Sequence, residues 1–90
     1  MKPIHEMKYL QLGLKIAYYR KLKGLTQEQL AEAIDRTPAF IGHVEAPNVN
    51  KAISLDTLFD IAAVLEIPPH KFLIFEDQQA PKVCERIKNN

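Results

Sequence analysis

The stretch from Gly24 to Glu45 limits the fold more tightly than any other part of this 90-residue chain. Thr26 and Gln29 form a capping-box pattern, in which the threonine hydroxyl accepts from the amide of residue 29 and the glutamine side chain reaches back to the threonine amide. Thr37 and Pro38 give a second start signal, a capping residue followed by proline at the first helical position. We therefore expect two helices of about two turns each, joined by a turn of roughly three residues.

Apolar spacing gives each of these helices one inward face. Leu30, Ala31 and Ile34 share a face of the first helix because they stand at helical spacing. Ile41 and Val44 form a narrow inward line in the second helix. The opposite side of the second helix carries Pro38, Ala39, Gly42 and His43. We expect that side to face outward.

Three segments resemble the Cro/Xre family of transcription regulators, the phage-repressor type of helix-turn-helix protein. They are RKLKGLTQEQLA (Arg20 to Ala31), then Thr37, Ile41 and Glu45, then SLDTLFDIA (Ser54 to Ala62). The resemblance covers about residues 8–75 and implies an all-α fold, a compact five-helix bundle of the lambda-repressor-like DNA-binding class. In that class the third helix lies in the major groove.

The chain departs from the family pattern in two places. Asp35 stands where the family usually has a glycine, and aspartate tolerates a left-handed backbone better than most residues, so the turn is expected to survive. The loop from Ala46 to Ile53 is longer than usual and holds one cation, Lys51. Because the family loop is basic and contacts phosphate, this second departure affects the backbone contacts rather than the fold.

The family resemblance places DNA contacts on the second helix of the motif and beside it. A phosphate contact is expected at Gln27, with simple cap support as the alternative, whereas Thr37 is expected first as a cap and second as a phosphate ligand. After the helix, the expected phosphate clamp consists of Asn48, Asn50 and Lys51.

The base-facing family positions fall on Pro38, Ala39 and His43. Pro38 and Ala39 have no side-chain hydrogen-bond donor, so they reach a thymine methyl at most. His43 is the one polar reader, able to donate to a guanine acceptor, and a plain exposed histidine is the alternative. Phe40 either packs against the first helix of the motif or meets a sugar or thymine methyl. Few side chains of this helix can form hydrogen bonds with base edges, so we expect sequence specificity to come partly from DNA shape.

Arg20 and Glu45 have a different expected role. In the family the two matching positions pair and tie the first helix to the end of the recognition helix. We therefore favour a structural ion pair at Arg20 over a direct phosphate contact.

Helices flank the motif on both sides. The first helix is expected over about residues 7–22, with apolar residues on two faces. Its core stripe is Tyr9, Leu12, Ile16 and Tyr19. Its second apolar line is Leu10, Leu14 and Tyr18. Either the C-terminal tail or a second subunit covers that line.

We expect the protein to be a homodimer. The first helix carries more apolar surface than the core stripe uses, and proteins of this family usually pair through their fifth helix.

The fourth helix is expected to begin after Ser54, a capping residue. Its expected inward face is Leu55, Leu58, Ile61, Ala62 and Leu65. Pro68 ends it, because the residue before a proline is pushed out of the helical region. A fifth helix beginning near Pro69 is expected to be anchored by Phe72, Leu73 and Phe75.

The two ends are assigned outside the bundle, residues 1–7 as a flexible arm and residues 76–90 as a polar tail. Cys84 is the only cysteine, which excludes an intrachain disulfide and a cysteine-rich metal site and fits a reducing cytoplasm. No apolar run approaches the roughly 20 residues needed to span a bilayer, and no signal-peptide pattern is present. We expect a cytoplasmic protein without membrane contact.

Charge is distributed unevenly along the chain although its total is only +1. Residues 1–24 carry six Lys or Arg against one Glu, a net charge of +5, whereas residues 25–60 carry a net charge of −4. A basic first helix is a weak footprint for phosphate, and a solvated helix face explains it equally well.

Together these patterns predict a small transcription regulator that binds double-stranded DNA sequence-specifically, with a recognition helix at about residues 37–45 in the major groove. No cofactor or metal is expected, and no paired carboxylates, Gly-rich phosphate loop or activated nucleophile indicates an enzyme. The alternative is a protein-interaction module with the same fold, antitoxin-like or a co-regulator, that reads bases weakly or not at all. Pro38 and Ala39 at reader positions motivate that alternative.

Overall fold

The computed structural model of the protein describes residues 2–49 and 51–75. In chain order its elements are η1 (Pro3–His5), α1 (Glu6–Lys23), α2 (Gln27–Ala33), α3 (Pro38–Glu45), α4 (Leu55–Leu65) and η2 (Pro69–Leu73). This part of the chain contains no β-strand, so the predicted all-helical class is confirmed for it.

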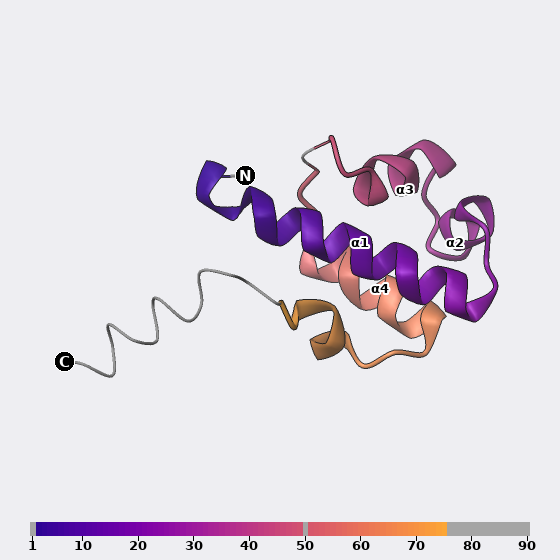
Figure 1. Ribbon diagram of the computed structural model, residues 1–90. Helices are drawn as coiled ribbons and strands as arrows, with labels where there is room; N and C mark the ends of the chain where they lie inside the picture. Colours follow the sequence, from indigo (N-terminus) through magenta and orange to yellow (C-terminus); the bar gives the residue numbers. More distant parts are fainter. Residues whose placement is uncertain (1, 50, 76–90) are drawn as a thin grey trace.

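The long helix α1 runs through the middle of the molecule, and the other helices lie around it (Figure 1). On one side of α1 lies α3, with α2 next to it near the C-terminal end of α1, while α4 and η2 lie on the other side. The helix-turn-helix pair α2–α3 therefore occupies one flank of the molecule, where α3 has a side that faces away from the bundle.

All three helix-start signals are in place. Thr26 Oγ1 accepts from the Gln29 amide at 3.0 Å, and Gln29 Oε1 accepts from the Thr26 amide at 2.8 Å. Thr37 and Ser54 each accept, through the side-chain hydroxyl, from the amide three residues further on, at 3.1 Å in both cases. The predicted starts of α2, α3 and α4 are therefore confirmed.

The turn between α2 and α3 contains Asp35 in the left-handed region, with φ 57°. The next amide, that of Arg36, donates to the Ala31 carbonyl at 2.8 Å and so closes the end of α2. The aspartate therefore adopts the conformation for which the family uses glycine, and the turn survives as predicted.

One hydrophobic core joins the four α-helices. Its buried members are Leu12, Ile16, Leu30, Ala31, Ile34, Ile41, Val44, Leu58, Ile61, Ala62, Leu65 and Phe72. The inward faces predicted for α2 and α3 are confirmed, and so is the core stripe of α1, where Tyr9 and Tyr19 pack at the edge of the core. The second apolar line of α1 lies outside the core, with Leu14 and Tyr18 exposed. What covers that line stays a prediction.

The predicted fifth α-helix is wrong. Pro69–Leu73 form the short 3-10 helix η2, in which the Lys71 amide donates to the Pro68 carbonyl at 3.0 Å. The chain is already extended at Ile74, with φ −86° and ψ 108°, so the five residues of this segment leave room for little more than the tighter 3-10 turn. The described residues therefore form four α-helices, not five.

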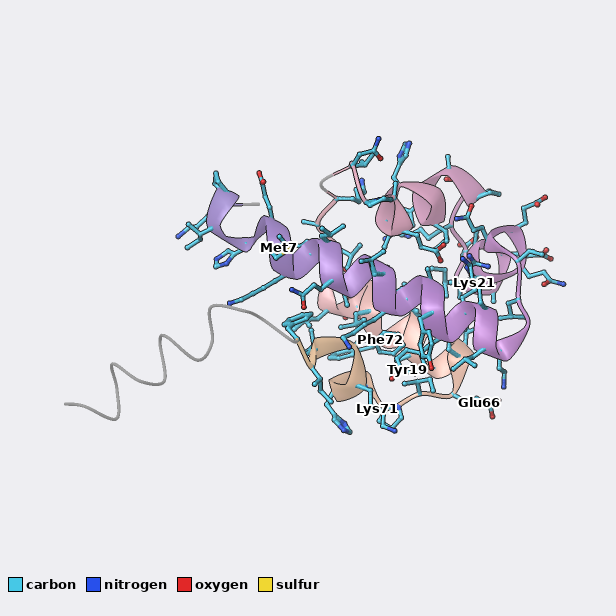
Figure 2. All side chains as sticks on the ribbon, in the orientation of Figure 1. Met7, Tyr19, Lys21, Glu66, Lys71 and Phe72 are labelled. Atoms are coloured by element: carbon cyan, nitrogen blue, oxygen red, sulfur yellow. The ribbon has the colours of Figure 1, made fainter. Side chains whose placement is uncertain are left out.

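One side chain anchors η2 to the rest of the fold. Phe72 is fully buried and meets Tyr19 of α1 edge to face, with ring centroids 5.2 Å apart (Figure 2). Of the other two predicted anchors, Phe75 is half-buried against the core, whereas Leu73 is exposed, so that part of the prediction is wrong. Phe72 alone fills the core because a single 3-10 turn cannot direct two successive residues inward.

The prediction that Leu55 faces inward is also wrong, because 60% of this residue is exposed. Leu55 is the first residue of α4 and stands at the edge of its apolar arc, where it borders a surface hollow instead of the core. The buried position in that turn belongs to Thr57.

At the N-terminus, η1 leads directly into α1, which begins at Glu6, one residue earlier than expected. Pro3 occupies the first turn of η1, so it starts this helical turn instead of interrupting one. The flexibility assigned to residues 1–7 stays a prediction. The predicted tail, residues 76–90 with Cys84, lies outside the described residues.

Gly13, in the middle of α1, lies where the backbone of α3 comes close to α1. A Cβ atom added there would overlap the carbonyl oxygen of Val44 and lie 3.2 Å from its carbonyl carbon. Because these atoms belong to the backbone, they cannot turn aside as a flexible side chain would. Gly13 therefore allows α1 to contact the C-terminal end of α3, a requirement that the sequence analysis did not identify.

We predict that Gly13→Ala lowers the free energy of unfolding by about 1–3 kcal/mol, because the added methyl overpacks this contact. In an open helix the same change would stabilise by about 1 kcal/mol. Gly42→Ala in α3 is the matched control, because a Cβ there would lie in ordinary contact, 3.6 Å from the Gln27 side-chain oxygen. Urea unfolding of both variants checks the prediction, and a Gly13→Ala variant more stable than the parent would contradict it.

Candidate nucleic-acid interface

The outer face of α3 consists of side chains that take no part in the core. Pro38, Ala39 and His43 are exposed, and Gly42 is half-buried. Helical spacing places these four positions on one side of the helix. The structure therefore brings together the three residues that the sequence analysis assigned to base contacts.

Two positions on this face carry very small side chains. Ala39 and Gly42 present a methyl group and a hydrogen atom, so the helix backbone lies close to the surface between them. His43 carries the only side-chain hydrogen-bonding group among the four positions. Thr37, which is exposed at the N-cap, uses its hydroxyl to accept from the amide of Phe40 at 3.1 Å.

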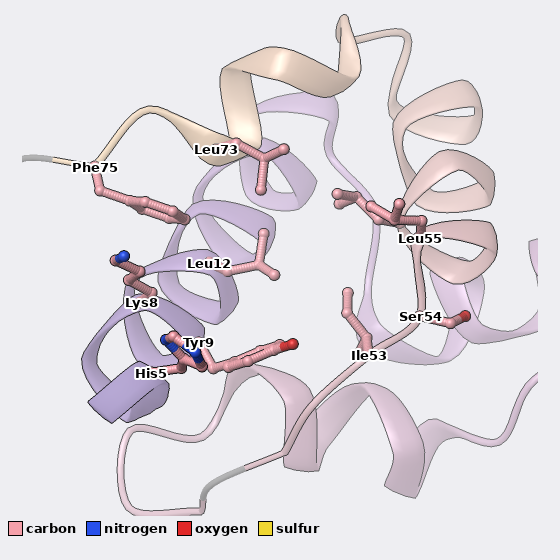
Figure 3. A pocket seen from close by; sticks show the side chains of 10 residues that line it. His5, Lys8, Tyr9, Leu12, Ile53, Ser54, Leu55, Leu73 and Phe75 are labelled. Carbon is pink, nitrogen blue, oxygen red and sulfur yellow. The ribbon is translucent and has the colours of Figure 1, made fainter. Parts of the chain in front are cut away.

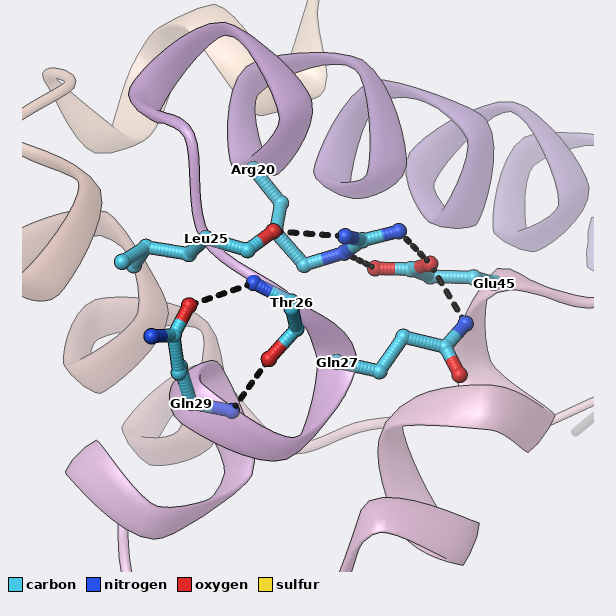
Figure 4. Close-up of polar contacts among 6 residues, drawn as sticks. All are labelled: Arg20, Leu25, Thr26, Gln27, Gln29 and Glu45. Atoms are coloured by element: carbon cyan, nitrogen blue, oxygen red, sulfur yellow. Dashed lines mark hydrogen bonds and ion pairs between the residues drawn. The ribbon is translucent and has the colours of Figure 1, made fainter.

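A buried ion pair holds the C-terminal end of α3 to α1 (Figure 4). Arg20 Nε donates to Glu45 Oε2 at 2.7 Å, and Arg20 Nη2 donates to Glu45 Oε1 at 2.9 Å. Both residues are 7% exposed. The third guanidinium nitrogen donates to the Leu25 carbonyl oxygen at 2.7 Å, so the same arginine also fixes the loop between α1 and α2. This two-point geometry is the strong form of a charge-assisted contact.

Gln27 joins the start of α2 to this pair. Its Nε2 donates to Glu45 Oε1 at 2.9 Å, which directs the side-chain amino group inward (Figure 4). No buried side-chain nitrogen or oxygen in the described residues lacks a hydrogen-bond partner, so the network is complete. One N–H of the Gln27 side chain is thus already engaged, and the phosphate contact expected there stays a prediction.

Phe40 stands at the edge of α3, between the core and the outer face. The ring is half-buried and packs against the core. The guanidinium carbon of Arg36 lies 4.4 Å from the ring centroid, and Lys51 Nζ lies 5.4 Å from it. Two cations, one from the turn before α3 and one from the loop after it, therefore lie against the same aromatic ring.

Arg36 is the residue of this surface that the sequence analysis missed. Besides lying over Phe40, it donates from Nη2 to Thr57 Oγ1 of α4 at 3.0 Å. The available signal was its place directly before the N-cap Thr37, with an aromatic residue one helical turn further on. Its contact with α4 had no signal in the local sequence.

The predicted phosphate clamp lies in the loop between α3 and α4. Asn48 and Lys51 are exposed there. Asn50, the third predicted member, lies outside the described residues.

A hollow of about 340 Å³ lies apart from α3, between the N-terminal half of α1, the start of α4 and η2 (Figure 3). Its lining includes Lys8, Tyr9, Leu12, Ile53, Leu55 and Phe75. No residue of α3 lines it, so it is separate from the outer face.

Over residues 2–49 and 51–75, no three His, Cys, Asp or Glu side chains are grouped so as to hold a metal ion. In the same part of the chain, no helix combines the length and the apolar character needed to cross a membrane.

The chain matches the model of the helix-turn-helix family over residues 16–72. Among solved structures it is similar to the restriction-modification controller protein C.AhdI from Aeromonas hydrophila, with a TM-score of 0.69 and 28% sequence identity. That similarity covers 76% of this chain and 96% of the controller protein. No curated protein sequence matches the chain.

We predict that Arg20→Met lowers the free energy of unfolding by about 3–5 kcal/mol, because Glu45 is left buried without a counter-charge. The control is Lys23→Met, which breaks the exposed ion pair between Lys23 and Glu66 and should cost less than about 1 kcal/mol. The double variant Arg20→Met/Glu45→Met should regain much of the loss, because no unpaired charge remains. Urea unfolding measures all three. Equal costs for the Arg20 and Lys23 variants would contradict the prediction.

Proposed function

The chain belongs to the Cro/Xre-type helix-turn-helix family, and we propose that it is a small transcription regulator that binds double-stranded DNA sequence-specifically, with α3 lying in the major groove. The similarity to a restriction-modification controller protein supports a regulatory role.

The outer face of α3 is the observation that carries this proposal. On the inner side of α3, Ile41 and Val44 are buried in the core, and Glu45 ties the end of the helix to α1. On the outer side, Pro38, Ala39 and His43 are exposed. A major groove about 12 Å wide admits a helix that is about 10–12 Å across with its side chains. The low profile at the small residues would let the helix approach the base edges closely.

Two cations beside this face support binding to a polyanion, although residues 25–60 as a whole carry a net charge of −4. Arg36 and Lys51 both lie against the ring of Phe40 in α3. Contacts from such cations to phosphates supply affinity without reading sequence. Sequence preference would then depend on His43, on thymine methyl contacts and on the shape of the duplex.

A salt titration tests the proposal. Duplexes enriched from a randomised pool and a random duplex are each titrated with the protein at several salt concentrations, with fluorescence anisotropy as the readout. We expect affinity to fall steeply with salt for both duplexes, and the enriched duplex to bind more tightly. Absence of duplex binding at low salt would overturn the proposal and favour the protein-interaction module.

We predict that His43→Ala relaxes the preference at one base step by about 1–3 kcal/mol, because it removes the one polar reader of α3. The control is Lys71→Gln on η2, which lies away from α3 and should leave the preference unchanged (Figure 2). The measurement is competition binding against duplexes changed at each position of the enriched site. A His43→Ala variant with an unchanged profile would remove this residue from the readers.

We further propose that the working form is a homodimer. Two exposed apolar surfaces are available for pairing. The α4–η2 surface consists of Leu55, Phe59, Leu73 and Ile74, and the α1 surface consists of Leu14, Tyr18 and Leu22. Several exposed apolar side chains on each surface support pairing through one of them.

We predict that Phe59→Glu or Tyr18→Glu shifts the protein from dimer to monomer, because a carboxylate at the centre of the pairing surface would lose its water on association. The variant on the other surface is then the matched control and stays dimeric. Analytical ultracentrifugation at tens of micromolar (roughly the range in which weak dimers persist) measures both. A parent protein that is purely monomeric there would contradict the homodimer.

A further inference from the structure

The hollow beside α1 takes no part in the proposed contact with DNA, because no residue of α3 lines it. Its volume is about 340 Å³, and two buried core residues, Leu12 and Leu58, form its base. Small-molecule sites in proteins have volumes of about 300–1,000 Å³ and mostly apolar walls with a few polar groups. The hollow falls at the lower end of that range, so it has room for a small ligand.

Apolar side chains form most of the wall of the hollow. Those above the base are Ile53, Leu55, Leu73 and Phe75, and Figure 3 shows Leu55 and Leu73 pointing toward Leu12. Leu55 is 60% exposed and Leu73 is 46% exposed, so the wall presents apolar surface to water. Removal of such surface from water is favourable, and an apolar ligand seated here would achieve it.

The polar groups that can meet a ligand all lie on the α1 side of the hollow. His5 ends η1, and Lys8 and Tyr9 belong to the first turn of α1 (Figure 3). The fourth polar lining residue, Ser54, uses its hydroxyl in the cap of α4. There the hydroxyl accepts from the Thr57 amide at 3.1 Å and forms a hydrogen bond with Thr57 Oγ1 at 3.0 Å. The hollow is therefore polar on one side and apolar on the others.

The charge on the polar side is positive. Lys8 is exposed and belongs to no ion pair between described residues. Among the described residues that line the hollow, none is an aspartate or a glutamate. The His5 ring has an N–H and the Tyr9 side chain an O–H, and both can donate to an anion. The arrangement complements a ligand with an anionic group at one end of an apolar body.

We propose that the hollow binds a small apolar carboxylate, with the carboxylate at Lys8 and the hydrocarbon part against Leu12, Leu55 and Leu73. An aliphatic carboxylate has one charged end for a single lysine to meet. Its body carries no group that would lose a hydrogen bond against the apolar wall. The site is separate from the outer face of α3, so it does not depend on the proposed function.

Titrations of the full chain with octanoate, octanol and octylammonium test the site, because these probes share one hydrocarbon chain and differ in the head group. Two-dimensional amide NMR spectra recorded during each titration give the affinity and show which amides shift. We expect octanoate to bind more tightly than octanol, and octanol more tightly than octylammonium. The amides that shift should belong to residues 5–12, 53–58 and 73–75, whereas those of Ala39, Gly42 and His43 should not shift.

The Lys8→Gln variant isolates the contribution of the charge. Because Lys8 is exposed, we expect octanoate affinity to fall by about 2–5-fold, as for an exposed ion pair, and octanol affinity to stay unchanged. Lys21→Gln is the matched control, since this exposed lysine stands in the C-terminal half of the same helix and does not line the hollow. Leu73→Ala removes part of the apolar wall and should weaken octanoate and octanol by the same factor. Thermal unfolding verifies that each variant is folded.

The site is overturned if octanoate does not bind at millimolar concentration, or if octylammonium binds as tightly as octanoate. Equal octanoate affinities of Lys8→Gln and Lys21→Gln would also overturn it, because only unspecific apolar contact would remain. A failure of the protein to bind DNA would overturn the proposed function and leave the carboxylate site in place.

Two other occupants of the hollow have their own signatures. Octanoate binding that disappears as the protein dimerises would assign Leu55 and Leu73 to a contact between two copies of the chain. The second occupant is the segment that follows Phe75, which begins with Glu76 and Asp77. Binding of octanoate by Glu76→Gln/Asp77→Asn but not by the parent would assign the hollow to that segment. Either result overturns the carboxylate site.

Discussion

The C-terminal end of α3 is held in place through one carboxylate. Glu45, the last residue of α3, accepts from Arg20 of α1 and from Gln27 at the start of α2, and the same arginine holds the loop between those two helices. A buried ion pair contributes little net stability when compared with apolar packing, because both groups lose their hydration. Its contribution here is geometric: a two-point contact permits one orientation of the partners. The outer face of α3 takes no part in this network, so its residues can differ without moving the helix.

The sequence predicted those features whose interacting residues are neighbours along the chain. The Thr26 capping box, the Thr37 cap before Pro38 and the Ser54 cap are each complete within four positions, and all three are present. Inward faces followed from helical spacing, because burial of a helix needs only one apolar side. The contact between Arg20 and Glu45 spans 25 positions and had no local signal. It was expected only through the family resemblance.

The features that escaped prediction depend on partners distant in sequence. In the sequence, Gly13 looks like any other glycine within a helix. Only the structure shows that the Val44 carbonyl lies against it. Arg36 reads as a turn residue, and its hydrogen bond reaches Thr57, 21 positions away. Leu55 fits the apolar pattern of α4, but the pattern does not show where the core ends. The first turn of α4 extends past the core, so Leu55 is exposed at the surface hollow. Pattern fixes which side of an element is apolar, whereas packing decides how much of that side is covered.

In the proposed complex, a helix with one polar side chain on its outer face would discriminate sequences mainly through the shape of the groove that it enters. Bidentate contacts from arginine, asparagine or glutamine would give base specificity directly, and none of these residues stands at Pro38, Ala39, Gly42 or His43. In the proposed complex, the contacts of Glu45 with Arg20 and Gln27 hold the C-terminal end of α3, so the outer face would meet the duplex as one surface. The width of the major and minor grooves varies with DNA sequence. A duplex whose groove admits this surface closely would therefore bind more tightly than one whose groove does not, although the surface itself carries few groups that read bases.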